Sequence, residues 1–124
     1  MVVAFEKDYL KELYEKGSCS DKQHRFQPPV IKLYKRRIEQ LQAAPSPESL
    51  YRFNALHFEA LKGDKAGLFS IRVNNQYRIE FALDSVPDNA IIKICKIVEL
   101  SNHYDWYVYT ARGKSRYDCQ QLDA

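Results

Sequence analysis

Arg72 and Arg78 flank the centre of LFSIRVNNQYRIEF, residues 68–81, in which apolar and polar side chains alternate. This alternation predicts a β-hairpin with one buried face. The two arginines share the face opposite to that of Ile71 and Ile79. Two guanidinium groups on the exposed face of a hairpin either increase solubility or bind an anion.

The position of the three-residue hairpin loop decides how the two arginines face each other. If residues 74–76 form the loop, Arg72 faces Arg78 directly, and the repulsion between like charges predicts a bound anion. If residues 75–77 form the loop, Arg72 faces Glu80 in an ion pair of small energetic consequence. Both registers keep the alternation and place both arginines away from the core.

The histidines and cysteines, which could bind a metal or form disulfides, are widely spaced along the sequence. They are His24, His57, His103, Cys19, Cys95 and Cys119. This spacing is not that of a zinc site, and an odd number of cysteines suits a reducing compartment. We therefore expect no metal and no cofactor, and we expect Cys95 to be buried in a strand.

The composition is that of one folded domain. The chain has 124 residues, of which 45% are hydrophobic and 28% charged, and this balance argues against extensive disorder. No apolar run approaches the length of a membrane span, and the N-terminus lacks a signal-peptide pattern. We expect a cytoplasmic protein, and the net charge of +3 weakly favours an anionic partner.

The first half of the chain predicts a short strand over 2–5 and helices over 5–17 and 29–44, with Gly17 ending the first helix. A third short helix is expected after Ser46, its predicted cap. The second helix has a basic face, which we expect to be solvated; its residues are Lys32, Lys35, Arg36 and Arg37.

The second half of the chain predicts strands. After the hairpin, residues 84–89 are expected to form a loop and residues 90–104 a long strand. Apolar residues occur at both parities of this strand, so either helices cover both of its faces or a bulge near Lys96 shifts the alternation. The order of elements predicts an α+β domain with N-terminal helices packed on one face of a small twisted antiparallel sheet.

The stretch LKGDKAGLFSIRVNNQYRIEF closely resembles the HigB-type toxins of the RelE/ParE superfamily. The resemblance rests on LKGD followed by Gly67, on the SIRVN-x-QYRI hairpin and on the ending ELSNHY. It covers residues 1–105, which we expect to form a single toxin domain. Residues 106–124 are then a partly ordered C-terminal extension.

The resemblance implies a toxin of a type II toxin–antitoxin system. HigB-type toxins resemble ribosome-dependent endoribonucleases (mRNA interferases) that cut mRNA and so inhibit translation. The implied partners are a helix-turn-helix antitoxin similar to HigA, the ribosome and mRNA, with DNA contacted only through the antitoxin and no membrane involved. The alternative within the superfamily is a ParE-like toxin that inhibits DNA gyrase by binding, without cleaving RNA.

The resemblance also implies roles for residues that bind RNA. Arg78, in QYRI, matches the arginine on the family's sheet and is expected to bind the scissile phosphate. Lys62, in LKGD, matches a lysine at the rim of the site and supplies a second positive charge. Arg72 is either a further RNA ligand or the ion-pair partner of Glu80.

Proton transfer is implied for residues on either side of these cations. The strand end carries His103 and Tyr104, and His103 is the expected general base because imidazole titrates near neutral pH. Glu59, three residues before Lys62, is the alternative base. The expected reaction is metal-independent transesterification, in which the ribose 2′-OH attacks the adjacent phosphorus.

Overall fold

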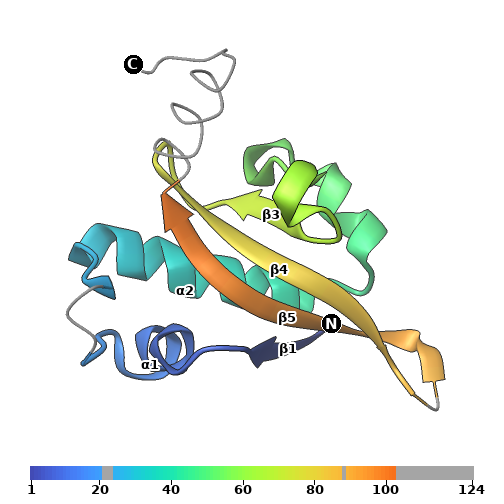
Figure 1. The fold of residues 1–124 in the computed structure, drawn as a ribbon, viewed down its shortest axis with the longest axis horizontal. Coiled ribbons are helices and arrows are strands. Elements are labelled where there is room, and N and C mark those ends of the chain that lie inside the picture. Colours follow the sequence, from blue (N-terminus) through green and yellow to red (C-terminus); the bar gives the residue numbers. More distant parts are fainter. Residues whose placement is uncertain (21–23, 88, 103–124) are drawn as a thin grey trace.

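A computed structural model describes residues 1–20, 24–87 and 89–102 of the chain (Figure 1). Five strands form one sheet in the order β1-β5-β4-β3-β2. The elements are β1 (Val2–Phe5), α1 (Asp8–Lys16), α2 (Pro28–Ala43), the 3₁₀ helices η2 (Pro47–Arg52), η3 (Asn54–Leu56) and η4 (Gly63–Lys65), and the strands β2 (Glu59–Ala60), β3 (Phe69–Arg72), β4 (Tyr77–Val86) and β5 (Asn89–Asn102).

The two long helices end where the sequence predicts and α2 begins within one residue of its predicted start, whereas α1 begins at Asp8, three residues after its predicted start. Gly17 follows α1 in the left-handed conformation (φ +76°), and its N–H donates to the Leu13 carbonyl at 3.1 Å. A non-glycine residue there would be strained, so the glycine ends the helix at low cost. Helix α2 starts at Pro28, where a missing N–H removes no helical hydrogen bond.

The helices pack on one face of the sheet, and α2 passes behind β4 and β5 in Figure 1. The core contains side chains from both layers: Leu10, Leu13, Tyr34, Ile38 and Leu41 from the helices, and Ile71, Ile79, Phe81, Cys95 and Ile97 from the sheet. Burial of one such large apolar side chain stabilises the fold by ~2 kcal/mol. The predicted α+β architecture is confirmed.

A bulge in β5 explains its irregular alternation. Phe81 faces Ile97 and Glu80 faces Glu99, which leaves Val98 as an extra residue between the two pairs. The extra residue shifts the alternation by one, so apolar side chains before and after it reach the same face. Of the two explanations left open by the sequence, the bulge is the one that the pairing supports.

Three local predictions are wrong. The expected loop over 84–89 is mostly strand, because β4 continues to Val86 and β5 begins at Asn89. The sheet is not antiparallel throughout, since β1 pairs with β5 in parallel. The short strand β2 was not expected from the sequence; its Glu59 faces Ser70 of β3.

Two further expectations hold in part. The third helix forms over Pro47–Arg52 as a 3₁₀ helix, but Ser46 at its start makes no side-chain capping hydrogen bond. On α2, Arg36 is exposed as expected, whereas Arg37 is half-buried. Within the described ranges, no helix combines the length and the apolar character needed to cross a bilayer. The expected domain boundary at 105/106 lies outside the described residues.

Candidate functional site

The β3–β4 hairpin has the register in which its two arginines face each other. Arg72 faces Arg78, and the N–H of Val73 donates to the Tyr77 carbonyl at 2.9 Å, which leaves a three-residue loop over 74–76. The competing register, with Arg72 opposite Glu80, is wrong. The hairpin therefore sets two like charges directly opposite each other, which destabilises a sheet unless other groups compensate.

Contrary to expectation, the centre of the sheet face that carries the arginines is buried. Arg78 is 8% exposed, Glu80 6% and Ser70 0%. Lys65, in η4, crosses this face, and its ammonium group donates to a carboxylate oxygen of Glu80 at 2.6 Å. Gly63 begins η4 with φ +66°, the conformation that the tight turn before Lys65 requires.

Arg78 is paired with a carboxylate. Its Nη1 donates to Oε1 of Glu59 at 2.8 Å, and its Nη2 donates to the carbonyl oxygen of His57 at 3.3 Å. The Glu59 side chain is 50% exposed, whereas that of Arg78 is 10% exposed. Glu59 therefore partly neutralises Arg78 and presents its carboxylate to solvent beside a guanidinium group.

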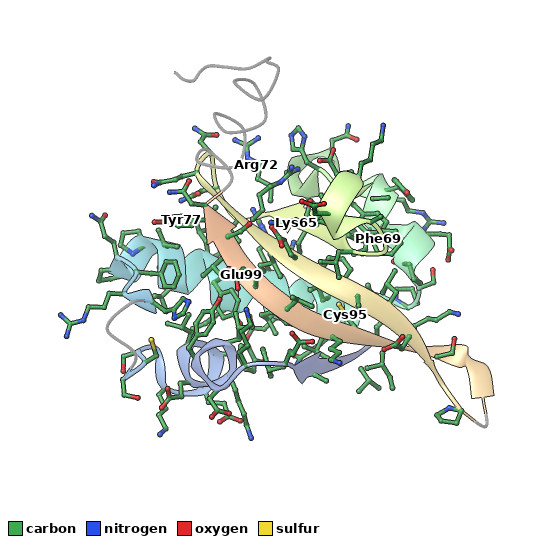
Figure 2. The ribbon with its side chains drawn as sticks, in the orientation of Figure 1. Lys65, Phe69, Arg72, Tyr77, Cys95 and Glu99 are labelled. Atoms are coloured by element: carbon green, nitrogen blue, oxygen red, sulfur yellow. The ribbon has the colours of Figure 1, made fainter. Side chains whose placement is uncertain are left out.

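Arg72 has only neutral partners among the described residues. Its Nε donates to the Asn74 carbonyl at 3.3 Å, its Nη1 lies 3.2 Å from Nε2 of His57, and its Nη2 donates to Oδ1 of Asn75. Figure 2 places Arg72 beside the hairpin turn. These contacts fix the direction of the guanidinium group and leave its positive charge uncompensated.

A cavity of about 230 Å³ lies at the arginine pair, and its lining residues are His57, Arg72, Asn74, Asn75 and Arg78. Two guanidinium groups, one of them without a counter-charge, favour an anionic ligand in this cavity. The half-exposed carboxylate of Glu59 on Arg78 adds a group that can accept a proton. The site can therefore bind a phosphate group and transfer a proton beside it.

His57 contacts both arginines and was not predicted as a site residue. Its carbonyl accepts from Arg78, and its Nε2 must accept from Arg72, because arginine has only donors. The contact with Arg72 is a hydrogen bond in the His57 tautomer whose ring proton is on Nδ1. Its backbone is left-handed (φ 48°), a strained conformation for a non-glycine residue that concentrates at functional sites.

The loop residues shape the cavity. Oδ1 of Asn74 accepts from the N–H groups of Gln76 and Tyr77 at 2.8 and 2.7 Å. This turn directs the Asn74 carbonyl and the neighbouring Asn75 side chain toward Arg72. The sequence contained this signal, since Asn-Asn-Gln between two strands is a turn pattern, but it gave no indication that the turn would bind the arginine.

The other predicted site residues are not all brought to the cavity. Lys62 is exposed, and its ammonium group makes no hydrogen bond or ion pair within the described part of the chain; Lys65 contacts the sheet instead. His103 and Tyr104 lie outside the described residues. In the described ranges, no three His, Cys, Asp or Glu side chains are clustered as metal ligands.

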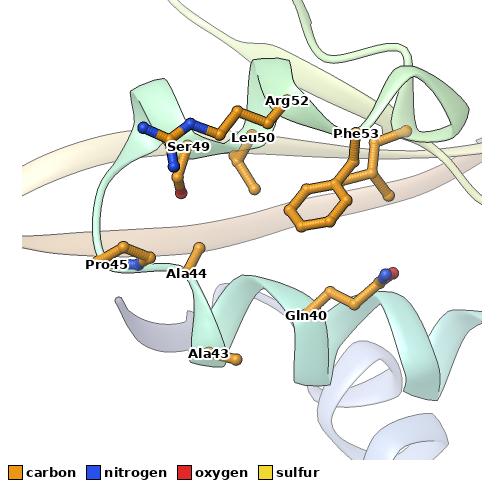
Figure 3. A pocket seen from close by; sticks show the side chains of 9 residues that line it. Gln40, Ala43, Ala44, Pro45, Ser49, Leu50, Arg52 and Phe53 are labelled. Atoms are coloured by element: carbon orange, nitrogen blue, oxygen red, sulfur yellow. The ribbon is translucent and has the colours of Figure 1, made fainter.

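A second hollow, of about 260 Å³, lies between the end of α2 and η2 (Figure 3). Its lining includes Ala44, Leu50 and Phe53, with Arg52 at its edge. Arg52 is the one charged residue of its lining, which contains no histidine or carboxylate to transfer a proton. The arginine cavity is therefore the better candidate for a reaction site.

Comparisons with known proteins identify the family of the chain. Residues 3–95 match the family model of the HigB-like toxins, described as the RelE-like toxin of type II toxin–antitoxin system HigB. Toxin HigB-1 of Vibrio cholerae serotype O1 is 38% identical over 95 residues, which cover 74% of this chain and 95% of that toxin.

One solved structure supports the same fold. A YoeB/ParE toxin from Agrobacterium tumefaciens matches with a TM-score of 0.54 and 15% identity, over 84% of this chain and all of that one. The RelBE2 toxin–antitoxin complex of Mycobacterium tuberculosis has a TM-score of 0.41 and 16% identity, over 82% of this chain and 95% of the other. From its sequence match, the chain belongs to the HigB-like family of RelE-like toxins of type II toxin–antitoxin systems.

Proposed function

We propose that this toxin is a ribosome-dependent endoribonuclease that cleaves mRNA by metal-independent transesterification. The observation that carries the proposal is the unequal pairing of the two facing arginines. Arg72 keeps an uncompensated charge, and Arg78 holds the carboxylate of Glu59 at 2.8 Å. Arg78, which faces Arg72, thus connects a phosphate-binding cation to a carboxylate that can accept a proton, and an internal attack on phosphorus requires both groups.

In this reaction the scissile phosphate binds Arg72, and not Arg78 as the family resemblance implies, because Arg78 is already paired with Glu59. A base takes the proton of the ribose 2′-OH, and the 2′ oxygen forms a bond to the adjacent phosphorus. The bond from phosphorus to the 5′ oxygen breaks, and an acid gives that oxygen a proton. The products are a 2′,3′-cyclic phosphate and a free 5′-OH. The guanidinium groups stabilise the negative charge that develops on the phosphate oxygens.

Glu59 is the base that the described residues favour. Its carboxylate is half-exposed, lies against Arg78 and belongs to β2, a strand that pairs with β3. His103 and Tyr104 have roles that rest on the family resemblance alone. With Glu59 as the base, His103 is the group suited to protonate the 5′ oxygen, since an imidazolium group is a stronger acid than a phenol.

The partners follow from membership of a type II system. We propose a helix-turn-helix antitoxin similar to HigA, which holds the toxin inactive, and the ribosome, which presents mRNA to the site. The net charge of +3 is compatible with contacts to RNA, although it does not identify them. Two arginines face each other, and within the described residues Arg72 has no acidic partner, which supports a phosphate-binding role for this face.

The test is cleavage of a defined mRNA on programmed ribosomes by toxin released from its antitoxin. We expect wild-type toxin to produce new mRNA ends with a cyclic phosphate, and we expect Arg72→Gln to lower the cleavage rate by roughly 10- to 100-fold, the value of a charge-assisted hydrogen bond. Arg52→Gln is the matched control, because Arg52 is exposed and does not line the arginine cavity. Intact mRNA together with altered plasmid supercoiling in cells would overturn the proposal in favour of gyrase inhibition.

A further inference from the structure

We propose that Arg37 of α2 is a positioning residue that fixes the backbone of Arg72 and so aims its guanidinium group at the substrate phosphate. This inference rests on the proposed ribonuclease function. It concerns a residue in the helical layer, for which the sequence predicted only a solvated surface.

Two hydrogen bonds carry the inference. The Nε of Arg37 donates to the carbonyl oxygen of Arg72 at 2.9 Å, and its Nη1 donates to Oε1 of Gln40, one turn along the helix, at 2.8 Å. The fork of the guanidinium group thus joins a helix side chain to the last residue of β3. A planar guanidinium group with two fixed donors holds the Arg72 carbonyl at a defined position relative to α2. A single rotatable ammonium group does not.

The surroundings of Arg37 favour a side chain that is hydrogen-bonded to Arg72 over one that points into solvent. Its side chain is half-buried. Burial lowers the pKa of Arg37, and the nearby charges of Arg36 and Arg72 lower it further. A cation that is partly desolvated beside another cation is retained where its hydrogen bonds offset the repulsion.

The hydrogen bond from Arg37 adds a backbone restraint to the side-chain contacts that hold Arg72. The guanidinium group of Arg72 is held by Asn74, Asn75 and His57 on one side of the hairpin turn. Those three contacts orient the side chain relative to the turn, and the Arg37 contact ties the backbone of the same residue to α2. Without Arg37, the Arg72 carbonyl loses its link to α2, and the guanidinium group that we propose to bind phosphate is held only by the hairpin loop and by His57.

The helix offers a matched control at the next position. Arg36 carries the same charge and is exposed, and its guanidinium group makes no hydrogen bond or ion pair with any residue that the structure describes. If α2 acted only through its positive charge on RNA, Arg36 and Arg37 would contribute similarly. If Arg37 acts by positioning, removal of Arg37 alone will affect the chemical step.

The experiment measures kcat and KM for mRNA cleavage on programmed ribosomes, with wild-type toxin as the reference for the proposed activity itself. We expect Arg37→Gln to lower kcat by about 10-fold or more, because misplacement of a catalytic group costs up to about 100-fold, and to change KM by less than about twofold. Arg36→Gln should retain kcat within about twofold.

Two further variants separate positioning from charge and from folding. Arg37→Lys keeps the charge but not the fork, so we expect it to remain as impaired as Arg37→Gln; recovery to more than about half of the wild-type kcat would overturn the inference. In an Arg72→Gln background, Arg37→Gln should add less than about a twofold loss, because both changes disable the same contact. Full additivity would also overturn it.

If Arg37→Gln fails to fold, Gln40→Met tests the same chain of contacts. It removes only the second acceptor of Arg37, and we expect a kcat loss of about threefold that disappears in the Arg72→Gln background. A loss that persists there counts against positioning. If wild-type toxin itself does not cleave mRNA, the proposed function fails, and this failure is distinct from equal activity of the Arg36 and Arg37 variants.

Discussion

Arg72 and Arg78 face each other across the β3–β4 hairpin, yet only Arg78 contacts a carboxylate within the described residues. Arg72 is held by a carbonyl, an amide oxygen and an imidazole, none of which carries a negative charge. The electrostatic cost of the like-charged pair is therefore offset on one side only. A bound anion would neutralise the positive charge of Arg72 as well. This is the physical basis for a phosphate-binding site there.

Glu59→Gln should change substrate binding and cleavage in opposite directions. Glutamine keeps an oxygen that accepts from Arg78, but it removes both the negative charge and the proton acceptor. We expect binding of a non-cleavable mRNA, with a 2′-deoxy nucleotide at the cleavage position, to tighten by a few-fold. We expect cleavage to fall by about 100-fold or more, the usual contribution of a general base. An unchanged cleavage rate would remove Glu59 as the base and leave His103 for that role.

Substitutions of His57 should distinguish the effect of its left-handed backbone on stability from the effect of its imidazole ring on cleavage. Asparagine tolerates the left-handed conformation better than alanine, so His57→Ala should lower the free energy of unfolding by about 1 kcal/mol relative to His57→Asn. Both variants lose the imidazole that accepts from Arg72. We therefore expect both to cleave mRNA more slowly, by similar factors, although only His57→Ala is less stable. Chemical denaturation and ribosome-programmed cleavage measure the two effects.

Much of the fold could be predicted because its signals are local. The alternation over 68–81 predicted the hairpin, and Gly17 and Pro28 marked the ends of the helices, as the structure confirms. The alternation was compatible with two registers, however, because a shift of the loop by one residue preserves which face each side chain occupies. The Asx turn of Asn74 fixes the register, and it depends on side-chain geometry that composition does not reveal.

The contacts that complete the site are long-range, which is why they were missed. His57 follows a one-turn 3₁₀ helix and has no periodic neighbours, so its left-handed backbone and its contact with Arg72 leave no pattern in the sequence. Arg37 belongs to a run of basic residues that reads as a solvated surface. Only the packing of α2 against the end of β3 distinguishes Arg37 from Arg36.

The Lys65–Glu80 pair predicts a strong dependence of stability on both partners. Glu80 is 7% exposed and Lys65 is 34% exposed in their side chains. Lys65→Met leaves a buried carboxylate without its partner, and we expect a loss of about 2 kcal/mol, below the 3–5 kcal/mol of a fully buried pair because Lys65 is partly solvated. The double variant Lys65→Met, Glu80→Met should recover most of that loss. Additive losses in urea denaturation would show that the two side chains do not act as a pair.

Alkaline pH should destabilise the fold through Cys95. Burial raises the pKa of the Cys95 thiol from 9.0 to about 12. Between these values the unfolded chain loses the thiol proton and the folded chain retains it, so stability is fully present below pH 9 and falls as pH rises, by at most about 1.4 kcal/mol per pH unit. Burial also raises the pKa values of Tyr9 and Tyr34, which adds to the loss above pH 10.

The contribution of Cys95 is measured as a slope. The free energy of unfolding is measured by urea denaturation under reducing conditions at pH 8, 9 and 10. We expect Cys95→Ala to be less stable than wild type at pH 8. Between pH 8 and pH 10, however, its free energy of unfolding should fall by about 1 kcal/mol less than that of wild type. Ile97→Val is the control, because Ile97 is equally buried in β5 and does not titrate, so this variant lowers stability without changing the slope. Equal slopes for Cys95→Ala and Ile97→Val would mean that the thiol does not account for the alkaline loss, which would then belong to the buried tyrosines.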